Sequence, residues 1–239
     1  AIHAIKGVSF EVNPGEVVTL IGANGAGKST TLQTVSGLLH SRTGSIEFLG
    51  ENLMGVPAHK VVAKGLAQVP EGRRVFLQMT VEENLEMGAY TRSGGDIDAD
   101  LEKVYAYFPR LMERRRQIAG TLSGGEQQRA WLAVLLAQDA PILLLDEPTT
   151  YLDVHHQLRI LDLLRRINEG WQKTIVVVLH DMNQAWQYAD EVVIMKDGAL
   201  VCTGPPQAVL TPERLWDVFS VRTDIVTTSD GRSAIVVLQ

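Results

Sequence analysis

Short apolar runs and helical patterns alternate along most of this chain. The run Val17–Ile21 is apolar and rich in β-branched residues, and it enters a glycine-rich turn. Thr30–Leu39, which follows that turn, has a helical pattern. In the second half, the apolar run Ile142–Leu145 precedes a helical pattern over Val154–Asn168. Strands interleaved with helices predict an α/β protein with a parallel sheet that helices cover on both faces.

The remaining segments add strands to this sheet and one region without strands. Thr80 and Glu83 have the spacing of a capping box, which opens a helix toward Gly88. A helical pattern resumes over Asp98–Phe108, so residues 80–135 are predicted to form a mostly helical insert. Outside this insert, the pattern predicts strands at Ile5–Val12, Gly44–Phe48, Leu66–Val69, Thr174–Leu179 and Val192–Met195, a helix at Met182–Ala189, and a C-terminal β pair of Ile225–Thr228 with Ala234–Leu238.

Composition narrows the classes of protein. The 239 residues have a formal net charge of -6, which gives nucleic-acid binding no support, and 45% of them are hydrophobic. Cys202 is the only cysteine in the sequence, so no internal disulfide can form. The longest apolar runs, Ile142–Leu145 and Ile175–Leu179, fall far short of the roughly 20 residues that cross a bilayer. We expect a soluble protein without a signal peptide, which meets a membrane only through a partner.

The glycine-rich turn has the Walker A pattern of phosphate-binding loops, from Gly22 to Ser29. Its glycines allow backbone N–H groups to turn toward an anion, and the start of the next helix adds partial positive charge. We expect the Lys28 ammonium to reach the outer phosphates and the Ser29 hydroxyl to bind Mg²⁺. The predicted nucleotide-binding residues are Asn24, Gly25, Ala26, Gly27, Lys28, Ser29 and Thr30.

Two carboxylates follow the apolar run Ile142–Leu145 and have the form of a Walker B motif. We expect this strand beside the phosphate-loop strand, which would bring Asp146 near Mg²⁺. Glu147, one residue further, would then polarise the attacking water. Taken alone, an apolar run that ends in Asp-Glu is equally typical of an ordinary strand meeting its loop.

Two more polar residues are candidates for the nucleotide site because each lies at or near the end of a predicted strand. His180 follows Ile175–Leu179 and is a candidate contact to the γ-phosphate, although a lone histidine there is more often structural. Gln68, late in Leu66–Val69, is a candidate ligand of Mg²⁺ or of water. These motifs predict that the protein binds a nucleoside triphosphate, but they do not identify the class of enzyme. No lysine follows Asn or Thr, as the guanine reader of a GTPase requires, whereas the spacing leaves a kinase open.

A motif ahead of the Walker B strand indicates the family. Leu122, Ser123, Gly124, Gly125, Glu126 and Gln127 resemble the signature of ATP-binding-cassette (ABC) ATPases, which places a serine and two glycines at the start of a helix. The chain resembles this family over its whole length. The resemblance implies a Q-loop at Gln68, a D-loop at Thr150–Asp153 with Asp153 at its end, and a switch histidine at His180.

The resemblance also implies a fold and an assembly. It predicts one ABC ATPase domain over residues 1–239, with the P-loop NTPase fold. Residues 1–79 and 136–239 would form a RecA-like core with an antiparallel β subdomain, and residues 80–135 a helical subdomain that carries the signature. Family members bury two ATPs in a two-fold dimer, each between the phosphate loop of one subunit and the signature of the other. Lys28, Glu147 and His180 would act in Mg²⁺-dependent hydrolysis. No residue here matches the aromatic side chain that stacks on adenine in the family, so none is assigned to that role.

The two halves resemble different importer ATPases. Glu82–Tyr90 and Gly120–Gln128 resemble branched-chain amino-acid importers, whereas Thr149–Asp153 and His180–Ala185 resemble iron-siderophore or cobalamin importers. One hypothesis is therefore a chimera with a seam near Glu126–Arg129, and the alternative is a divergent natural member.

Three functions compete. The first is the ATPase subunit of an importer, a homodimer docked to a membrane permease on the cytoplasmic face of the cell membrane. The second is a chimeric scaffold that binds nucleotide without serving a transporter. The third is a cassette protein acting on DNA or ribosomes, which the acidic balance disfavours.

Overall fold

The computed structural model describes residues 4–72, 75–91, 97–229 and 231–238. Within these residues, the largest sheet has six strands in the order β4-β5-β6-β1-β7-β8. Neighbouring strands from β4 to β7 pair in parallel, and β8 pairs antiparallel with β7. The strands are β1 (Val17–Gly22), β4 (Leu66–Val69), β5 (Ile142–Asp146), β6 (Thr174–Val178), β7 (Glu191–Lys196) and β8 (Ala199–Gly204).

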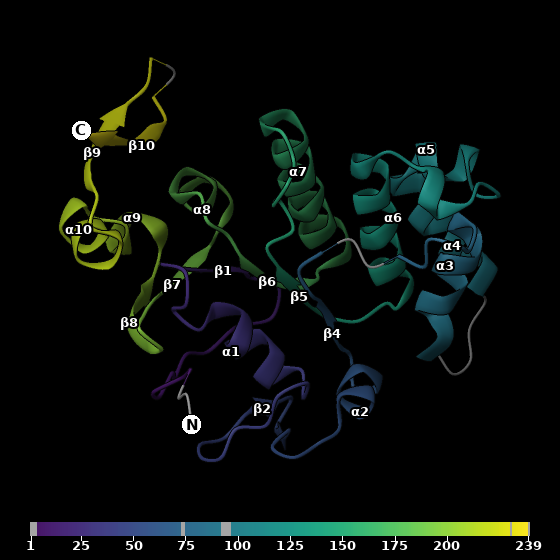
Figure 1. The fold of residues 1–239 in the computed structure, drawn as a ribbon, viewed down its shortest axis with the longest axis horizontal. Coiled ribbons are helices and arrows are strands. Elements are labelled where there is room, and N and C mark those ends of the chain that lie inside the picture. The colour runs from purple at the N-terminus through teal and green to yellow at the C-terminus, as the bar shows by residue number, and fades with distance from the viewer. Residues whose placement is uncertain (1–3, 73–74, 92–96, 230, 239) are drawn as a thin grey trace.

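The five parallel strands of this sheet are largely buried on both faces, as their continuous apolar sequences predict, whereas the edge strand β8 is partly exposed. Successive residues of one strand point to opposite faces, so β5 divides its side chains between two hydrophobic clusters. Leu143 and Leu145 belong to one cluster, and Leu144 belongs to the other. Figure 1 shows helices α7 (Val154–Trp171) and α8 (Met182–Tyr188) on one side of the sheet, with α1 (Lys28–Val35) and α2 (Ala58–Ala63) on the other.

The predicted helical insert is present. In Figure 1 its helices gather at the end of the sheet near β4 and β5. Thr80 caps α3 through the predicted capping box, in which its hydroxyl accepts from the Glu83 N–H. Val81 and Leu85 are fully buried in the same cluster as Leu132. The elements are α3 (Val81–Gly88), the 3-10 helix Ala89–Thr91, α4 (Ile97–Tyr107), α5 (Pro109–Glu113), the 3-10 helix Ala119–Thr121 and α6 (Gly124–Ala137).

Two strand predictions near the N-terminus need correction. Ile5–Val12 forms no strand in the structure, although alternate residues of this segment, among them Val8 and Phe10, do pack against the cluster beneath β1. The alternation of apolar residues therefore predicted the buried face of this segment correctly. The segment is not a strand, because its backbone does not form a β-ladder with a neighbour. The predicted strand Gly44–Phe48 shrinks to β2 (Glu47–Phe48), which pairs with β3 (Glu51–Asn52).

The first helix is also shorter than its pattern predicted. It ends at Val35 rather than Leu39, because Gly37 adopts a left-handed conformation with φ 77°. Gly37 can do so without steric cost, whereas the residues beyond it would otherwise continue the apolar pattern.

The C-terminal β pair forms as predicted, with β9 (Arg222–Thr227) antiparallel to β10 (Ser233–Leu238). Asn183 of α8 exchanges two hydrogen bonds with the backbone of Ile235, which attaches this hairpin to the core. Two short helices, α9 (Pro206–Val209) and α10 (Pro212–Phe219), precede it. Among the helices of the described residues, none combines the length and apolarity that a membrane span requires.

Candidate active site

The phosphate loop connects the end of β1 to the start of α1. A Cβ on Gly22 would lie 2.2 Å from the carbonyl oxygen of Met195 in the neighbouring strand β7, so only glycine fits there. Gly27, with φ 95°, is the N-cap of α1 and supplies no capping side chain. The first N–H groups of α1 therefore lack a side-chain acceptor and can bind an anion.

Lys28 lies folded into this loop. Its side chain is buried, and its Nζ donates to the carbonyl oxygens of Gly22 at 2.8 Å and Ala23 at 3.2 Å. Burial lowers the pKa of the Lys28 ammonium, whereas the carboxylates of Glu147 and Asp146 act in the opposite direction. Two carbonyl acceptors thus hold the ammonium where an outer phosphate would compete for it.

Ser29 and Asp146 meet although their elements are far apart in sequence. The Ser29 hydroxyl donates to Oδ1 of Asp146 at 2.8 Å. The expectation that β5 lies beside β1 is wrong, because β6 lies between them; the contact forms because α1 packs across to β5. Burial raises the pKa of Asp146 and the Ser29 hydrogen bond lowers it, while the charges of Glu147 and Glu71 raise it further. Two adjacent hard oxygen donors fit Mg²⁺, which takes one or two protein ligands together with phosphate oxygens.

Glu147 is held by two neighbours at the end of β5. Its Oε1 lies 2.6 Å from Nε2 of His180, and its Oε2 accepts from the Thr150 hydroxyl at 3.0 Å. Glu147 has a φ of 51°, a left-handed conformation that costs a non-glycine residue roughly 1–2 kcal/mol. The strand therefore ends in a turn that aims this carboxylate away from the sheet.

Gln68 does not reach the predicted metal site. Its Oε1 accepts a hydrogen bond from the hydroxyl of Ser36 at the end of α1, seven residues beyond Ser29. Seven residues of helix span roughly 10 Å along the axis. Its Nε2 is buried and has no hydrogen-bond partner among the described residues. In this structure Gln68 therefore contacts Ser36 rather than the Ser29–Asp146 pair.

Sequence reasoning missed Glu71, which lies beyond the end of β4 and whose charge raises the pKa of Asp146. With Glu147, Glu71 lines a cavity of about 290 Å³ whose other lining residues are Gly72, Gln128, Trp131, Thr150 and Tyr151. Its position three residues after Gln68, beyond the end of β4, was the available signal, because ligand-binding residues gather at the carboxyl edge of a parallel sheet.

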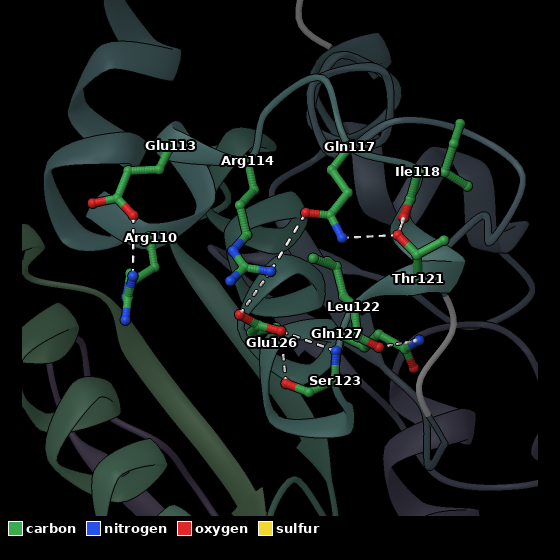
Figure 2. A network of polar contacts seen from close by, with 10 residues as sticks. All are labelled: Arg110, Glu113, Arg114, Gln117, Ile118, Thr121, Leu122, Ser123, Glu126 and Gln127. Carbon is green, nitrogen blue, oxygen red and sulfur yellow. Dashed lines mark hydrogen bonds and ion pairs between the residues drawn. The ribbon is translucent and has the colours of Figure 1, made fainter.

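The signature motif lies at the start of α6. Ser123 is the N-cap of this helix, and its N–H and hydroxyl both point to the Glu126 carboxylate, as Figure 2 shows. Leu122 is buried, and Gln127 donates to the carbonyl oxygens of Ala119 and Leu122. Gly124 and Gly125 open the helix without side chains.

Two contacts join the signature helix to the Walker B and D-loop segments. The buried Gln128 of α6 donates to the carbonyl oxygen of Pro148 at 2.7 Å, one residue after Glu147. Asp153 is the N-cap of α7 and accepts from the N–H of His156 at 2.9 Å and from its Nδ1 at 2.8 Å. The ring of this histidine lies against Gly125, where a Cβ would be 2.9 Å from its Cδ2. The structure thus brings Lys28, Ser29, Asp146, Glu147 and His180 together, whereas the signature lies with Asp153 and His156 as a separate group.

Comparison with known proteins decides the family. The family model described as ABC transporter matches residues 5–150, which is more than half of the chain. The chain belongs to this family. It is an ABC ATPase.

Relatives of this ABC ATPase include both importer types. It is 43% identical to the high-affinity branched-chain amino acid transport ATP-binding protein BraG of Pseudomonas aeruginosa, over 91% of this chain and 93% of that protein. It is 38% identical to the petrobactin import ATP-binding protein FpuC of Bacillus anthracis, over 95% of this chain and 85% of that protein. Because each relative matches nearly the whole chain, these alignments give no support to a chimera with a seam near Glu126–Arg129.

Solved structures agree with this fold. The ABC ATPase superposes on cbiO1 of Clostridium perfringens, part of the transporter complex cbiONQ, with a TM-score of 0.79 and 25% identity over 90% of this chain and 87% of cbiO1. It also resembles the dimeric post-hydrolysis state of the cassette MJ0796 bound to ADP and Pi, with a TM-score of 0.74 and 27% identity over 86% of this chain and 91% of that one. Cassette ATPases of this fold bind ATP, and this chain is one of them.

Proposed function

We propose that the chain is the ATP-hydrolysing subunit of an importer, which works as a dimer with two ATPs between its subunits. The observation that carries this proposal is the placement of Glu147. It lies between His180 and Thr150, on the wall of the 290 Å³ cavity and one residue from Asp146. This is the arrangement of a general base beside a phosphate site.

ATP binding begins at the phosphate loop. The uncapped N–H groups of α1 receive the β-phosphate, and Lys28 exchanges its two carbonyl acceptors for phosphate oxygens. Ser29 and Asp146 are proposed to hold Mg²⁺, with Glu71 rather than Gln68 as the third polar group of this edge. When bound, Mg²⁺ would neutralise charge on the β- and γ-phosphates.

Hydrolysis then needs one proton transfer and one bond exchange. Glu147 accepts a proton from water as the water oxygen forms a bond to the γ-phosphorus, and the bond to the β,γ-bridging oxygen breaks to release ADP. His180, within 2.6 Å of Glu147, holds the carboxylate in place and contacts the γ-phosphate. Lys28 neutralises the charge that develops on the phosphoryl oxygens.

The second subunit is proposed because the signature faces outward. Ser123 is exposed at the start of α6, and no contact in the described residues brings it to the phosphate loop of its own chain. A helix start with a serine and two glycines is an anion site, which a neighbouring copy's γ-phosphate would fill. The dimeric state of MJ0796 with ADP and Pi supports this arrangement.

The membrane partner is proposed from the relatives. BraG and FpuC are import ATP-binding proteins, which supports a permease partner on the cytoplasmic face of the membrane for this chain. BraG is named for branched-chain amino acids and FpuC for petrobactin, so similarity to them assigns no single solute to this chain.

Turnover against protein concentration tests this function. We expect Mg²⁺-dependent ATP hydrolysis whose rate per subunit rises steeply with protein concentration, because each site needs a partner's signature. A rate per subunit that stays constant on dilution would exclude shared sites. Co-purification with a permease, and its stimulation of turnover, tests the importer role.

A further inference from the structure

The signature serine is already occupied in the free subunit. Its hydroxyl donates to Oε2 of Glu126 at 2.7 Å, and its backbone N–H donates to the same oxygen at 2.9 Å. Figure 2 shows both bonds converging on one carboxylate oxygen at the start of α6. A serine hydroxyl has a single proton to donate. The proton that a partner's phosphate would need is therefore given to Glu126.

The other oxygen of this carboxylate faces an arginine. Nη1 of Arg114, just beyond α5, lies 3.5 Å from Oε1 of Glu126, and Arg114 also donates to Gln117 at 3.4 Å. Both hydrogen bonds from Ser123 lower the pKa of Glu126, and the positive charges of Arg114 and Arg129 act in the same direction. The group beside the anion site is thus a carboxylate, not a neutral acid.

We propose that Glu126 is an internal competitor of the partner's triphosphate for Ser123, and that Arg114 moderates this competition by pairing with it. The proposal rests on the proposed function, because it assumes that Ser123 binds the nucleotide of a second copy. In the open subunit Glu126 fills the serine donors and completes the cap of α6. On closure its carboxylate keeps the backbone N–H and releases the hydroxyl to the γ-phosphate.

The negative charge of Glu126 makes closure of the ATP-bound dimer less favourable. A carboxylate next to a triphosphate is repelled, and among the described residues the charges of Arg114 and Arg129 offset it. A neutral amide in the same place would still accept the Ser123 N–H, because its carbonyl oxygen can occupy the position of Oε2. It would hold the hydroxyl less strongly, since hydrogen bonds to charged acceptors are about twice as strong as neutral ones.

The test uses Glu147→Gln protein, which binds ATP without consuming it. ATP-dependent dimerisation is measured by sedimentation equilibrium for this protein alone and with Glu126→Gln added. We expect Glu126→Gln to favour closure about fivefold at each site, because a hydrogen bond to a charged acceptor is about 1 kcal/mol stronger than a neutral one, and the two sites together should tighten the dimer about 25-fold. The matched control is Glu113→Gln, which removes the same charge from a glutamate that pairs with Arg110 and does not contact Ser123. The control should leave the dimer constant unchanged.

A second pair of variants tests the role of Arg114. Arg114→Gln should weaken the ATP-bound dimer, because it leaves the Glu126 charge less compensated beside the triphosphate. That loss should largely disappear when Glu126→Gln is also present. Thermal unfolding of each variant checks that α6 keeps its cap.

Each outcome decides one proposal. If Glu147→Gln protein with ATP forms no dimer, the proposed function fails. If it forms a dimer that Glu126→Gln does not tighten, or that Glu113→Gln tightens equally, the competition by Glu126 is refuted and the function stands. An equal loss from Arg114→Gln with and without Glu126 would remove Arg114 from the proposal.

Discussion

Nε2 of His180 lies 2.6 Å from Oε1 of Glu147, across the gap between the ends of β6 and β5. The two residues are 33 positions apart in sequence, and the pairing of β5 with β6 brings them together. The other oxygen of Glu147 accepts from Thr150, so both carboxylate oxygens are engaged and the group has a defined direction.

Glu147→Gln should lower kcat by at least about 100-fold, the lower range for loss of a general base, while ATP still binds. The amide keeps the shape of the side chain but cannot accept the proton of water. Single-turnover hydrolysis and nucleotide binding, measured on the same preparation, separate the two effects. An activity close to that of the unchanged protein would remove Glu147 as the base.

His180→Ala should lower kcat more than it raises KM, because it removes the neighbour that orients Glu147 and leaves the phosphate loop intact. We expect a loss of roughly 10–100-fold, since misplaced catalytic groups cost that much. Steady-state kinetics over a range of ATP concentrations measures both constants. A rise in KM alone would place His180 in ground-state binding instead.

Gln128→Ala should destabilise the protein by about 1–3 kcal/mol, because it leaves the buried carbonyl of Pro148 without its donor. The bond links α6 to the residue after Glu147, so kcat should fall as well. Urea unfolding compares this variant with Gln207→Ala, at an exposed position of α9, which should change stability by less than about 0.5 kcal/mol. Equal stability of the two variants would contradict this account.

Gly125→Ala should impair turnover because its methyl group would lie 2.9 Å from Cδ2 of His156. The ring cannot move away freely, since Asp153 holds its Nδ1. Adding His156→Ala to this variant removes the clash and should restore part of the activity. Turnover that stays equally low in the double variant would show that the methyl group acts on the nucleotide rather than on His156.

Asp146→Asn should abolish Mg²⁺-dependent turnover and yet stabilise the free protein near neutral pH. Burial raises the pKa of Asp146 in the folded state above the unfolded value of about 3.9. A raised carboxyl pKa means that the folded state binds the proton more tightly. The stabilisation that this proton gives the folded state is therefore fully present below the unfolded pKa, and it is lost as the pH rises through the folded pKa. Thermal unfolding at several pH values should show that the stability gained by Asp146→Asn grows as the pH rises between these two pKa values. A gain that does not depend on pH would contradict a raised pKa of Asp146.

The sequence by itself determined the elements whose signals are local. The apolar run before Gly22, the glycines through Gly27 and the helix that begins at Lys28 all follow from short-range backbone preferences. The Thr80–Glu83 capping box is equally local, because its two hydrogen bonds join residues three positions apart. The Walker B pair and the signature were predictable for the same reason, as short motifs with a fixed chemistry.

Only the tertiary structure decided which of these segments meet. The insertion of β6 between β1 and β5, the contact of Ser29 with Asp146 and the bond from Gln128 to Pro148 join residues distant in sequence. The place of Glu71 beyond the end of β4 was a local signal, whereas the contact of Gln68 with Ser36 depends on how β4 and α1 pack together. The spacing of apolar residues determines which face of a helix or strand is buried. Which segment packs against that face depends on the packing of the whole chain.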